Sequence, residues 1–346
     1  MDIELNQTNK QLVQDFWRAL EASPTKDVAA TAGRFLDADI SWHGPDPING
    51  LTGLDSFARD FWLPLRESLP NFKRQSHLFF GGESNGRIDG TNDGHMWVTG
   101  TGYLTGTFEH DYLSIPATGR EASIRWGEFC RVQDGRIVEI FFLLDLVDLI
   151  QQAGLHVLPP SRGKDGQYPP PRANDGVMLE AQDAAASRYS LEHIRRFIFE
   201  GLNAFDQSDL KSMGMADYFH PGVHWYGPGG IGACLSFEEF ETLHQRPWLH
   251  AFPDRSVQDL DALIAEGEYS GAPGWDGVKA THTGEYLGHK ATGNSLGVNG
   301  LDWWKREGEM YVENWVFVDM IHLFRQLGVD LMARLAEQVA AGRGKR

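Results

Sequence analysis

Cysteine is scarce in this chain. Its 346 residues include two cysteines, Cys130 and Cys234. They stand far apart, in neither the paired spacing of a metal site nor that of a redox motif. This excludes a disulfide-stabilised scaffold and fits a reducing compartment, so we expect a cytoplasmic protein.

Positive charge is also in short supply. The chain has 31 Lys and Arg residues against 48 Asp and Glu, which gives a formal net charge of −17 and a pI of about 5.1. Nucleic acids and anionic membrane surfaces bind basic faces of proteins. We therefore expect neither as a partner.

Long apolar runs are missing as well. The longest, over residues 137–150, is interrupted by Glu139, Asp145 and Asp148, and a membrane-spanning helix needs about 20 predominantly apolar residues. The first residues contain neither the basic segment nor the apolar core of a signal peptide. The sequence thus predicts no membrane segment.

The chain contains the same strand–turn–strand pattern in each of its two halves. A strand over residues 122–131, a turn at Asp134-Gly135 and a strand over 136–144 form a hairpin pattern, and Asp-Gly between alternating runs is a strong hairpin signal. The second half repeats it with strands over 296–305 and 309–318. The corresponding pairs are 174 residues apart: Glu128 and Asp302 (302 − 128), Asp145 and Asp319, Gly154 and Gly328.

The repeat extends toward the start of each half at a larger offset. Trp42 and Trp225 lie 183 residues apart (225 − 42), and the segment 281–284 is matched here with 99–102. The fall from 183 to 174 predicts a loss of about nine residues in the second copy, placed in the hairpin after Gly106. Each copy has the element order α–α–β–α–β–β–β–β–α, which indicates an internal duplication.

A stretch rich in proline and glycine separates the copies. It includes Pro159-Pro160 and Pro169-Pro170-Pro171, and such composition is typical of an extended, stiff linker. The predicted organisation is a first domain over 1–158, a linker over 159–187 and a second domain over 188–346. We expect the two domains to pack as a pseudo-dimer within one chain, and the chain could also form a homo-oligomer.

The parity of residues along the hairpin strands singles out two carboxylates. Side chains alternate between the faces of a strand, and Glu128 shares its face with apolar residues such as Trp126 and Cys130. Asp302 shares its face with Val298 and Trp304. A carboxyl facing an apolar interior requires a partner or has a raised pKa. The two are candidates for general acid–base catalysis; alternatively each is paired with a neighbour such as Arg125 or Lys305.

Histidines and tryptophans supply further candidates. The first group, expected near strand ends at a pocket mouth, could polarise a carbonyl or simply be hydrogen-bonded structural residues: His43, His224, His282 and His289. The second group could line a ligand pocket or fill a core: Trp42, Trp225, Tyr226, Trp304 and Trp315. His220 and His224 have metal-like spacing, but Pro221-Gly222 between them removes the shared helical face, so no metal is predicted.

Taken together, several motifs resemble the SnoaL-like polyketide cyclases of the nuclear transport factor 2-like superfamily. They are Trp42-His-Gly-Pro45, Trp225-Tyr-Gly-Pro228, Ala251-Phe-Pro-Asp254, Thr281-His-Thr-Gly284, Ile115-Pro-Ala-Thr-Gly-Arg120, Asp134-Gly-Arg-Ile-Val-Glu139 and Asp319 with Gln326-Leu-Gly328. The resemblance implies an α+β fold in which a curved, mostly antiparallel sheet wraps around helices to form a cone with a deep apolar pocket.

The resemblance also implies cofactor-free chemistry, in which one pocket aspartate acts as acid and base during an intramolecular aldol ring closure. The family acid falls at Asp302 in the second copy and at Glu128 in the first. Because the second copy keeps the aspartate, His282 and Trp315, it is the predicted working copy. The function we expect is a cyclase or related lyase or isomerase acting on a small apolar carbonyl compound. The alternative is a binding module that holds such a molecule without converting it.

Overall fold

The computed structural model describes residues 2–342, which form two α+β domains. The elements of domain 1 are α1 (Ile3–Ala22), the 3-10 turn η1 (Thr25–Asp27), α2 (Val28–Ala32), β1 (Leu36–His43), β2 (Gly50–Thr52), α3 (Leu54–Ser56), the π-helical turn η2 (Phe57–Trp62), α4 (Leu63–Ser68), β3 (Lys73–Glu83), β4 (Met96–Thr107), β5 (Glu121–Gln133), β6 (Arg136–Leu144) and α5 (Leu146–Gln152).

Domain 2 repeats this order. Its elements are α6 (Ala184–Arg195), the π-helical turn η3 (Arg196–Gly201), the 3-10 turn η4 (Leu202–Ala204), α7 (Met215–Tyr218), β7 (Phe219–Tyr226), β8 (Ala233–Cys234), α8 (Phe237–Glu239), the π-helical turn η5 (Phe240–Gln245), α9 (Arg246–Ala251), β9 (Ser256–Val257), β10 (Ile264–Glu266), β11 (Tyr269–Thr281), β12 (Ser295–Glu307), β13 (Met310–Val318), α10 (Met320–Gln326) and α11 (Leu331–Ala340).

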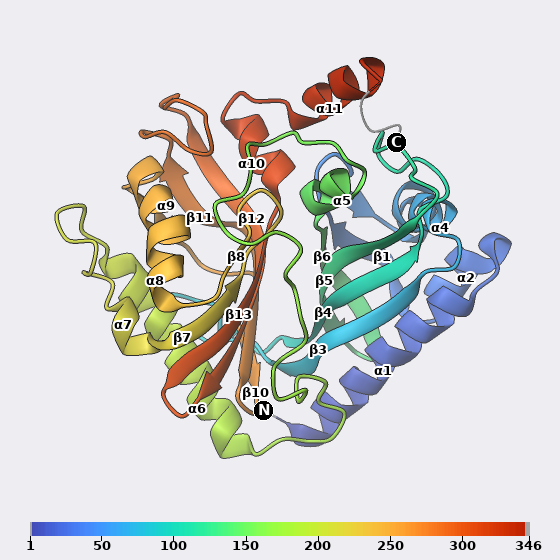
Figure 1. Cartoon of the computed structure of the whole chain (residues 1–346). Coiled ribbons are helices and arrows are strands. Elements are labelled where there is room, and N and C mark those ends of the chain that lie inside the picture. Colours follow the sequence, from blue (N-terminus) through green and yellow to red (C-terminus); the bar gives the residue numbers. More distant parts are fainter. Residues whose placement is uncertain (1, 343–346) are drawn as a thin grey trace.

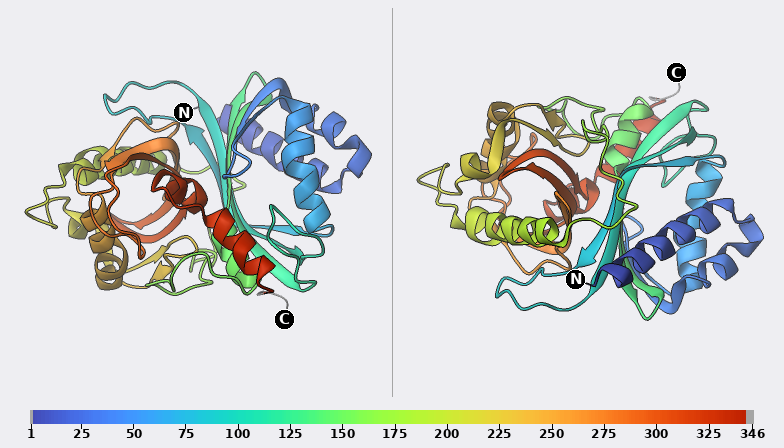
Figure 2. Two further views of the ribbon diagram at one scale, coloured as in Figure 1. Left: turned by 90° about the horizontal axis from the view of Figure 1, so that it is seen from above. Right: turned by 90° about the horizontal axis from the view of Figure 1, so that it is seen from below.

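Each domain is built on one curved sheet. The strand order is β2-β1-β6-β5-β4-β3 in domain 1 and β10-β11-β12-β13-β7-β8 in domain 2, where β9 also pairs with β11. The pairs β1–β6 and β13–β7 are parallel and the other pairs are antiparallel. Both sheets curve around their own helices (Figures 1 and 2). This confirms the predicted α+β cone in each half of the chain.

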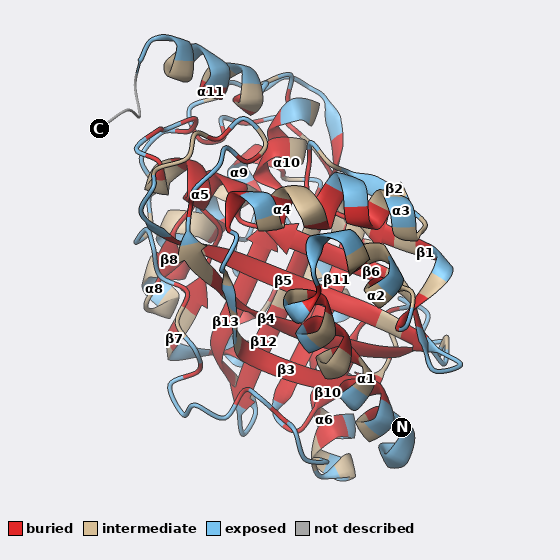
Figure 3. Cartoon of the chain, turned by 90° about the vertical axis from the view of Figure 1, so that its right-hand side faces the viewer, coloured by how far each residue is buried: buried red, intermediate tan, exposed pale blue. Residues whose placement is uncertain are grey.

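The two faces of each sheet pack against different parts of the molecule. The concave face covers the helices of its own domain; in domain 1, for example, α1 buries Val13, Phe16, Trp17 and Leu20 beneath the sheet. The convex face turns toward the other domain. As a result both faces are covered, and the strands are buried along most of their length (Figure 3).

The convex faces meet in an apolar layer between the domains. Phe129, Phe141 and Leu143 from domain 1 and Trp303 and Phe317 from domain 2 belong to one buried cluster. Trp303 is fully buried, its ring stacks on Phe129 at 5.3 Å, and its indole N–H donates to the Thr99 hydroxyl at 2.9 Å. A Cβ at Gly127 would lie 2.4 Å from the Trp303 ring, so this glycine lets the two sheets approach.

The segment between the domains runs as a strap along this layer (Figure 1). Tyr168 is buried there and its hydroxyl lies 2.7 Å from the Thr101 hydroxyl of β4. The carbonyl of Pro169 accepts a hydrogen bond of 2.8 Å from the Trp315 indole of β13. The strap therefore contacts both sheets.

Two equivalent aspartates join the domains reciprocally. Asp145 caps α5 and accepts the backbone N–H of Gly229 from domain 2 at 2.8 Å. Asp319 caps α10 and accepts the backbone N–H of Asp46 from domain 1 at 2.8 Å. The acceptors differ by 174 in number (319 − 145) and the donors by 183 (229 − 46), the two offsets of the repeat. Residue i contacts j and the copy of j contacts the copy of i, as in a two-fold symmetric dimer.

The structure corrects three details of the sequence interpretation. The connection from β4 to β5 has the same length as that from β11 to β12, whereas residues 84–95 between β3 and β4 correspond to the short turn Gly267-Glu268. The residues lost from the second copy therefore belong to the β3–β4 loop and not to the hairpin after Gly106. The apolar pattern of the sequence also predicts helices over 27–37 and 210–219, and the observed helices are shorter, at Val28–Ala32 and Met215–Tyr218.

Within residues 2–342, no helix combines the length and the apolar character that crossing a membrane demands.

Candidate active site

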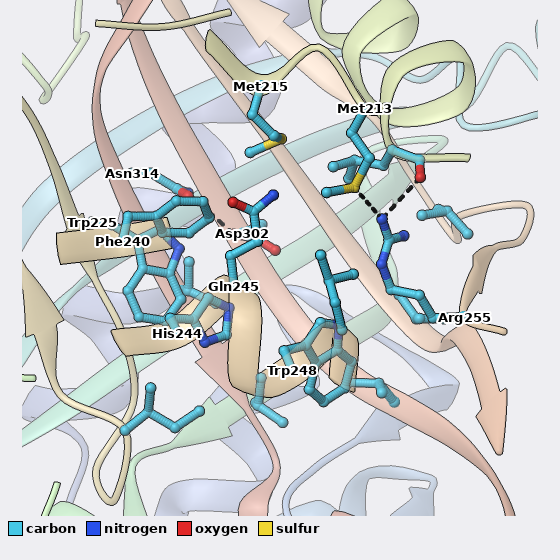
Figure 4. A pocket seen from close by; sticks show the side chains of 18 of the residues that line it. Met213, Met215, Trp225, Phe240, His244, Gln245, Trp248, Arg255, Asp302 and Asn314 are labelled. Carbon is cyan, nitrogen blue, oxygen red and sulfur yellow. Dashed lines mark hydrogen bonds between the residues drawn. The ribbon is translucent and has the colours of Figure 1, made fainter. Parts of the chain in front are cut away.

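Domain 2 contains a cavity between its sheet and its helices. Its volume is about 200 Å³, and its lining is mostly aromatic and aliphatic. Trp225 comes from β7, Trp248 from α9 and Trp304 from β12, while Met213 and Met215 close one side (Figure 4). Apolar walls with a few polar groups are typical of a small-molecule site.

A second lobe of about 110 Å³ adjoins this cavity. Asp302, Trp304 and Val298 line both lobes. The smaller lobe has a floor of small residues, Ala272, Gly274 and Gly300, at the crossing of β11 and β12. Asp302 therefore stands where the two lobes join.

Asp302 is the carboxyl group of the cavity. Strand alternation on β12 turns it inward with Trp304, as the sequence predicts, and it pairs across the sheet with Ala272 and Val316. Asn314 on β13 donates its amide N–H to Asp302 Oδ1 at 3.1 Å and to the Trp303 carbonyl at 2.9 Å, which fixes the amide. Burial raises the pKa of Asp302 to about 8, and the hydrogen bond from Asn314 only partly offsets it.

The turn η5 supplies two further polar groups, His244 and Gln245. Ser236 caps the preceding helix α8 by accepting the Glu239 N–H at 3.1 Å, and the Glu239 carboxylate accepts the Leu235 N–H at 2.7 Å. Burial lowers the pKa of His244 to about 3, so the ring is neutral at physiological pH, and it stacks on Trp225 at 4.1 Å. π-helical turns occur frequently at functional sites.

Arg255, in the turn after α9, is the cation of the cavity. Its Nη2 donates to the Leu202 carbonyl at 2.9 Å and approaches the Met213 sulfur at 2.5 Å (Figure 4). Burial lowers the pKa of Arg255 to about 10, which still leaves the guanidinium charged at neutral pH. The sequence interpretation missed this residue, as it missed His244, Gln245 and Asn314.

The equivalent carboxyl in domain 1 has different surroundings. Glu128 is buried and accepts the Trp17 indole N–H at 3.1 Å and the Cys130 thiol at 3.2 Å. Arg74 forms an ion pair with it at 3.4 Å. Arg125, which the sequence suggested as a partner, pairs instead with Asp145 and Asp148. Lys305 likewise pairs with Asp175 and not with Asp302.

A comparison of the two copies explains why the interior of domain 2 is open. Large side chains of domain 1 are replaced in domain 2 by smaller or polar ones at matching positions. The pairs are Trp62 and Gln245 (offset 183), Phe72 and Arg255 (183), Trp126 and Gly300 (174), and Ile140 and Asn314 (174). Trp62 and Trp126 are buried in domain 1, where Trp62 packs edge-on against Phe72 at 5.7 Å.

The predicted site residues divide between the two faces of the sheets. Trp225 and Trp304 line the cavity with Asp302. Trp42, the copy of Trp225, is packed in the core of domain 1 against Phe61 at 4.4 Å.

Four other predicted pocket residues lie on the convex face, toward the other domain. His43 stacks on Phe141 at 4.4 Å, and His224 lies 3.1 Å from the Tyr226 hydroxyl. Tyr226 and Trp315 belong to the buried layer between the domains. Strand alternation is the reason: once Trp42 and Trp225 point inward, their neighbours His43, His224 and Tyr226 point outward, and Trp315 alternates with Asn314 in the same way.

His282 and His289 are not among the cavity residues either. His282 contacts Thr292 at 3.1 Å and the Phe252 ring at 5.4 Å, and His289 lies 2.8 Å from Arg334. The strand register also corrects the alignment of His282. Its N–H and C=O bond to Asn294 and Gly293 just as those of Phe108 bond to Arg120 and Gly119. Phe108 is therefore its counterpart, and not Gly100.

Residues 2–342 contain no group of three His, Cys, Asp or Glu side chains arranged to hold a metal ion.

Two family sequence patterns match the chain, one in each half. The sequence pattern of the family described as SnoaL-like polyketide cyclase matches residues 193–327, and that of the SnoaL-like domain matches residues 13–140. Among curated protein sequences, none matches this chain.

Solved structures resemble one half of the chain at a time. AclR from Streptomyces galilaeus is 21% identical, with 41% of this chain and 86% of that one covered and a TM-score of 0.34. IdmH from Streptomyces antibioticus is 20% identical (40% and 99% covered, TM-score 0.32), and TsrD from Streptomyces laurentii is 24% identical (42% and 97%, 0.32). On the evidence of both sequence matches, the chain consists of two SnoaL-like domains in tandem and belongs to the SnoaL-like family.

Proposed function

We propose that domain 2 is a cofactor-free enzyme that moves a proton at a carbon next to a carbonyl group, with Asp302 as general base and then general acid. The observation that carries the proposal is Asp302 itself: a carboxyl with a pKa raised to about 8, held by Asn314, where two lobes of an apolar cavity join. A catalytic acid or base works best when its pKa lies near the operating pH.

The proposed reaction is an aldol-type ring closure. The Asp302 carboxylate takes a proton from the α-carbon, and the C–H electron pair becomes an enolate. The enolate carbon attacks a second carbonyl of the same molecule, forming a carbon–carbon bond and an alkoxide. The protonated Asp302 then returns the proton to the alkoxide oxygen, so the carboxylate is regenerated. The amide of Gln245, which also lines the cavity, is our candidate donor to the enolate oxygen.

A binding module for a small apolar molecule is the competing function. The predominantly apolar lining of the cavity favours it, since such walls bind without reacting. What favours catalysis is the polar company of Asp302 in this cavity: Asn314, Gln245, His244 and Arg255.

Hydrogen–deuterium exchange tests the first chemical step without knowledge of the substrate. Small cyclic aromatic ketones such as 1-tetralone and 2-tetralone are incubated with the protein in D₂O, and loss of the α-proton signal is followed by NMR. The intact chain should accelerate exchange, and the rate should rise with pH up to about 8 as Asp302 ionises. Asp302→Asn should reduce the rate by about 100-fold or more, the scale of general-base catalysis.

Glu128→Gln is the matched control, because it makes the same change at the equivalent position of domain 1. It should leave most of the exchange activity in place, since Glu128 is enclosed by Trp17, Arg74 and Cys130. If Glu128→Gln abolishes exchange and Asp302→Asn does not, domain 1 is the enzyme. Tight ketone binding without exchange in the wild type would instead support the binding module.

A further inference from the structure

We propose that Arg255 is the anion-binding residue of the domain 2 cavity, so that the natural ligand carries a carboxylate in addition to the carbonyl group at Asp302. This inference rests on the proposed function for the position of the carbonyl, and it adds the chemical class of the ligand. Arg255 and Asp302 line the same cavity as separate polar points (Figure 4).

The charge of Arg255 is buried without a counterion. The residue is 8% exposed, and among residues 2–342 no Asp or Glu is recorded within ion-pair distance of its guanidinium. Arg74, Arg125 and Arg306, which are comparably buried, each have a carboxylate partner. A buried charge is costly unless it is paired. The missing partner of Arg255 is therefore the feature that requires an explanation.

The guanidinium also keeps donors free. An arginine carries five N–H groups, and the hydrogen bonds recorded for Arg255 within the described chain, to Leu202 and Met213, both use Nη2. Within residues 2–342 its Nε and Nη1 have no hydrogen-bond partner, and neither nitrogen is completely buried. Because the residue lines the cavity, these donors are available to a molecule bound there.

The duplication provides an internal comparison. At the position of Arg255, domain 1 has Phe72, whose ring packs against Trp62 in a filled interior. An aromatic ring is thus sufficient at this position of the fold where only packing is required. Arg255 lines the cavity of domain 2 together with the other polar replacements, Gln245 and Asn314.

Geometry and charge favour a carboxylate over other anions. The planar fork of a guanidinium matches a carboxylate or a phosphate with two parallel hydrogen bonds. A phosphate would bring nearly two negative charges into an apolar cavity that offers one cation, and the excess charge would be costly to bury. A monocarboxylate balances the single positive charge of Arg255.

The test compares carboxylates with neutral molecules of the same shape. Binding of 2-naphthoate and 2-naphthamide, and of benzoate and benzamide, is measured at pH 7 by calorimetry. The wild type should bind the carboxylate of a pair about 10-fold more tightly or better, the scale of a hydrogen bond to a charged group. Arg255→Met, which keeps side-chain length without charge, should abolish the preference, and Arg255→Lys should retain part of it.

Two controls separate ligand recognition from a purely structural role. Met213→Leu removes the sulfur contact of Arg255 but leaves its charge, and should keep the carboxylate preference. Asp302→Asn should keep it too, because Asp302 is assigned to the carbonyl. Near-ultraviolet circular dichroism reports whether Arg255→Met is folded. If it is unfolded, the comparison of each carboxylate with its amide in the wild type and in Arg255→Lys still tests the proposal.

The proposal is overturned if no carboxylate binds more tightly than its amide in the wild type, including the case in which neither binds, or if the preference persists in folded Arg255→Met. Failure of the proposed function has a different signature. In that case exchange of the ketone α-proton does not depend on Asp302, while the carboxylate preference remains. The two results are therefore distinguishable.

Discussion

One position of the repeat, occupied by Glu128 and Asp302, shows how surroundings decide what a carboxyl group can do. Both lie on the central strand pair and point into their own domain. Glu128 is fixed by an ion pair with Arg74 and a bond from Trp17. Asp302 has an amide as its hydrogen-bond partner and an open cavity beside it. Glu128 therefore has the surroundings of a structural ion-pair residue, and Asp302 has those of a group able to exchange a proton with a bound molecule.

The raised pKa of Asp302 predicts a pH-dependent stability. Its pKa is 3.8 in the reference state and about 8 in the folded chain, so between these values the folded protein binds a proton that the unfolded chain has lost. Stability from this group is therefore complete below about pH 4 and is lost as the pH rises toward 8, by at most about 1.4 kcal/mol per pH unit. Urea unfolding of the wild type and of Asp302→Asn should show the variant gaining relative stability between pH 5 and pH 8.

The comparison of the wild type with Asp302→Asn isolates position 302. Other buried acids such as Asp319 titrate in both proteins, so they do not contribute to the difference between the two unfolding free energies. If the difference in unfolding free energy between the wild type and Asp302→Asn stays constant from pH 5 to pH 8, Asp302 is ionised throughout this range. That result would remove the basis for its assignment as a base near neutrality.

Strand parity could predict the inward direction of Glu128 and Asp302, because alternation is a property of the backbone. The same rule, applied to each neighbour, also excludes His224 and Tyr226 once Trp225 points inward. The missed residues, His244, Gln245 and Arg255, lie on a helical turn and a connecting turn. Only an alignment of the two copies at offset 183 could reveal them, as polar residues opposite Phe61, Trp62 and Phe72.

At the scale of elements, the helices η2 and η5 show how one framework is either filled or left open. Both are π-helical turns at the same place in the repeat. The first ends on Trp62, which is buried, and the second on Gln245, which lines the cavity. The central strands carry the same contrast, with Trp126 on β5 and Gly300 on β12.

Gln245→Trp should therefore fill the cavity from the helix side. The indole copies the residue that domain 1 has at this position, so the backbone already accommodates it there. We expect loss of ligand binding in calorimetry, with the free energy of unfolding unchanged or raised.

The reverse change, Trp62→Gln in domain 1, should destabilise the protein by about 3–5 kcal/mol, because it replaces a buried tryptophan with a smaller polar group. It should leave ligand binding in domain 2 intact. If Gln245→Trp binds ligands as the wild type does, the ligand lies elsewhere than in this cavity.

At the scale of the whole molecule, the two domains share one buried layer and two reciprocal hydrogen bonds. Trp303 stacks on Phe129 and bonds to Thr99, so an element of one domain completes the packing of the other. We expect the chain to unfold in a single calorimetric transition. Trp303→Ala should lower the stability of both domains together, by about 3–5 kcal/mol.

Two separate transitions in the wild type, or a loss confined to domain 2 in Trp303→Ala, would contradict this coupling. Phe237→Ala, at a partly buried position whose ring contacts Phe219 and Phe240 of domain 2, is a suitable control. Its effect should be smaller than that of Trp303→Ala.

The order of elements could be read from the sequence because the hairpins and amphipathic helices carry strong local signals. The place of the deletion could not, because motif matching alone aligned residues 281–284 with 99–102. The observed pairing of Thr281 with Ser295 and of Thr107 with Glu121 fixes the correct register. Hydrogen bonds between distant strands carry that information, and a short motif does not.

The filled interior of domain 1 has a consequence for how this chain can evolve. An empty cavity of about 200 Å³ costs roughly 5 kcal/mol relative to a filled core, and a single-domain enzyme must offset that loss within itself. Here the tryptophans of domain 1 fill its own interior, and the shared layer joins that filled domain to domain 2. With activity assigned to domain 2 as proposed above, stability and activity are divided between the copies, and we expect the cavity of domain 2 to accept destabilising changes in specificity more readily than a single-domain protein would.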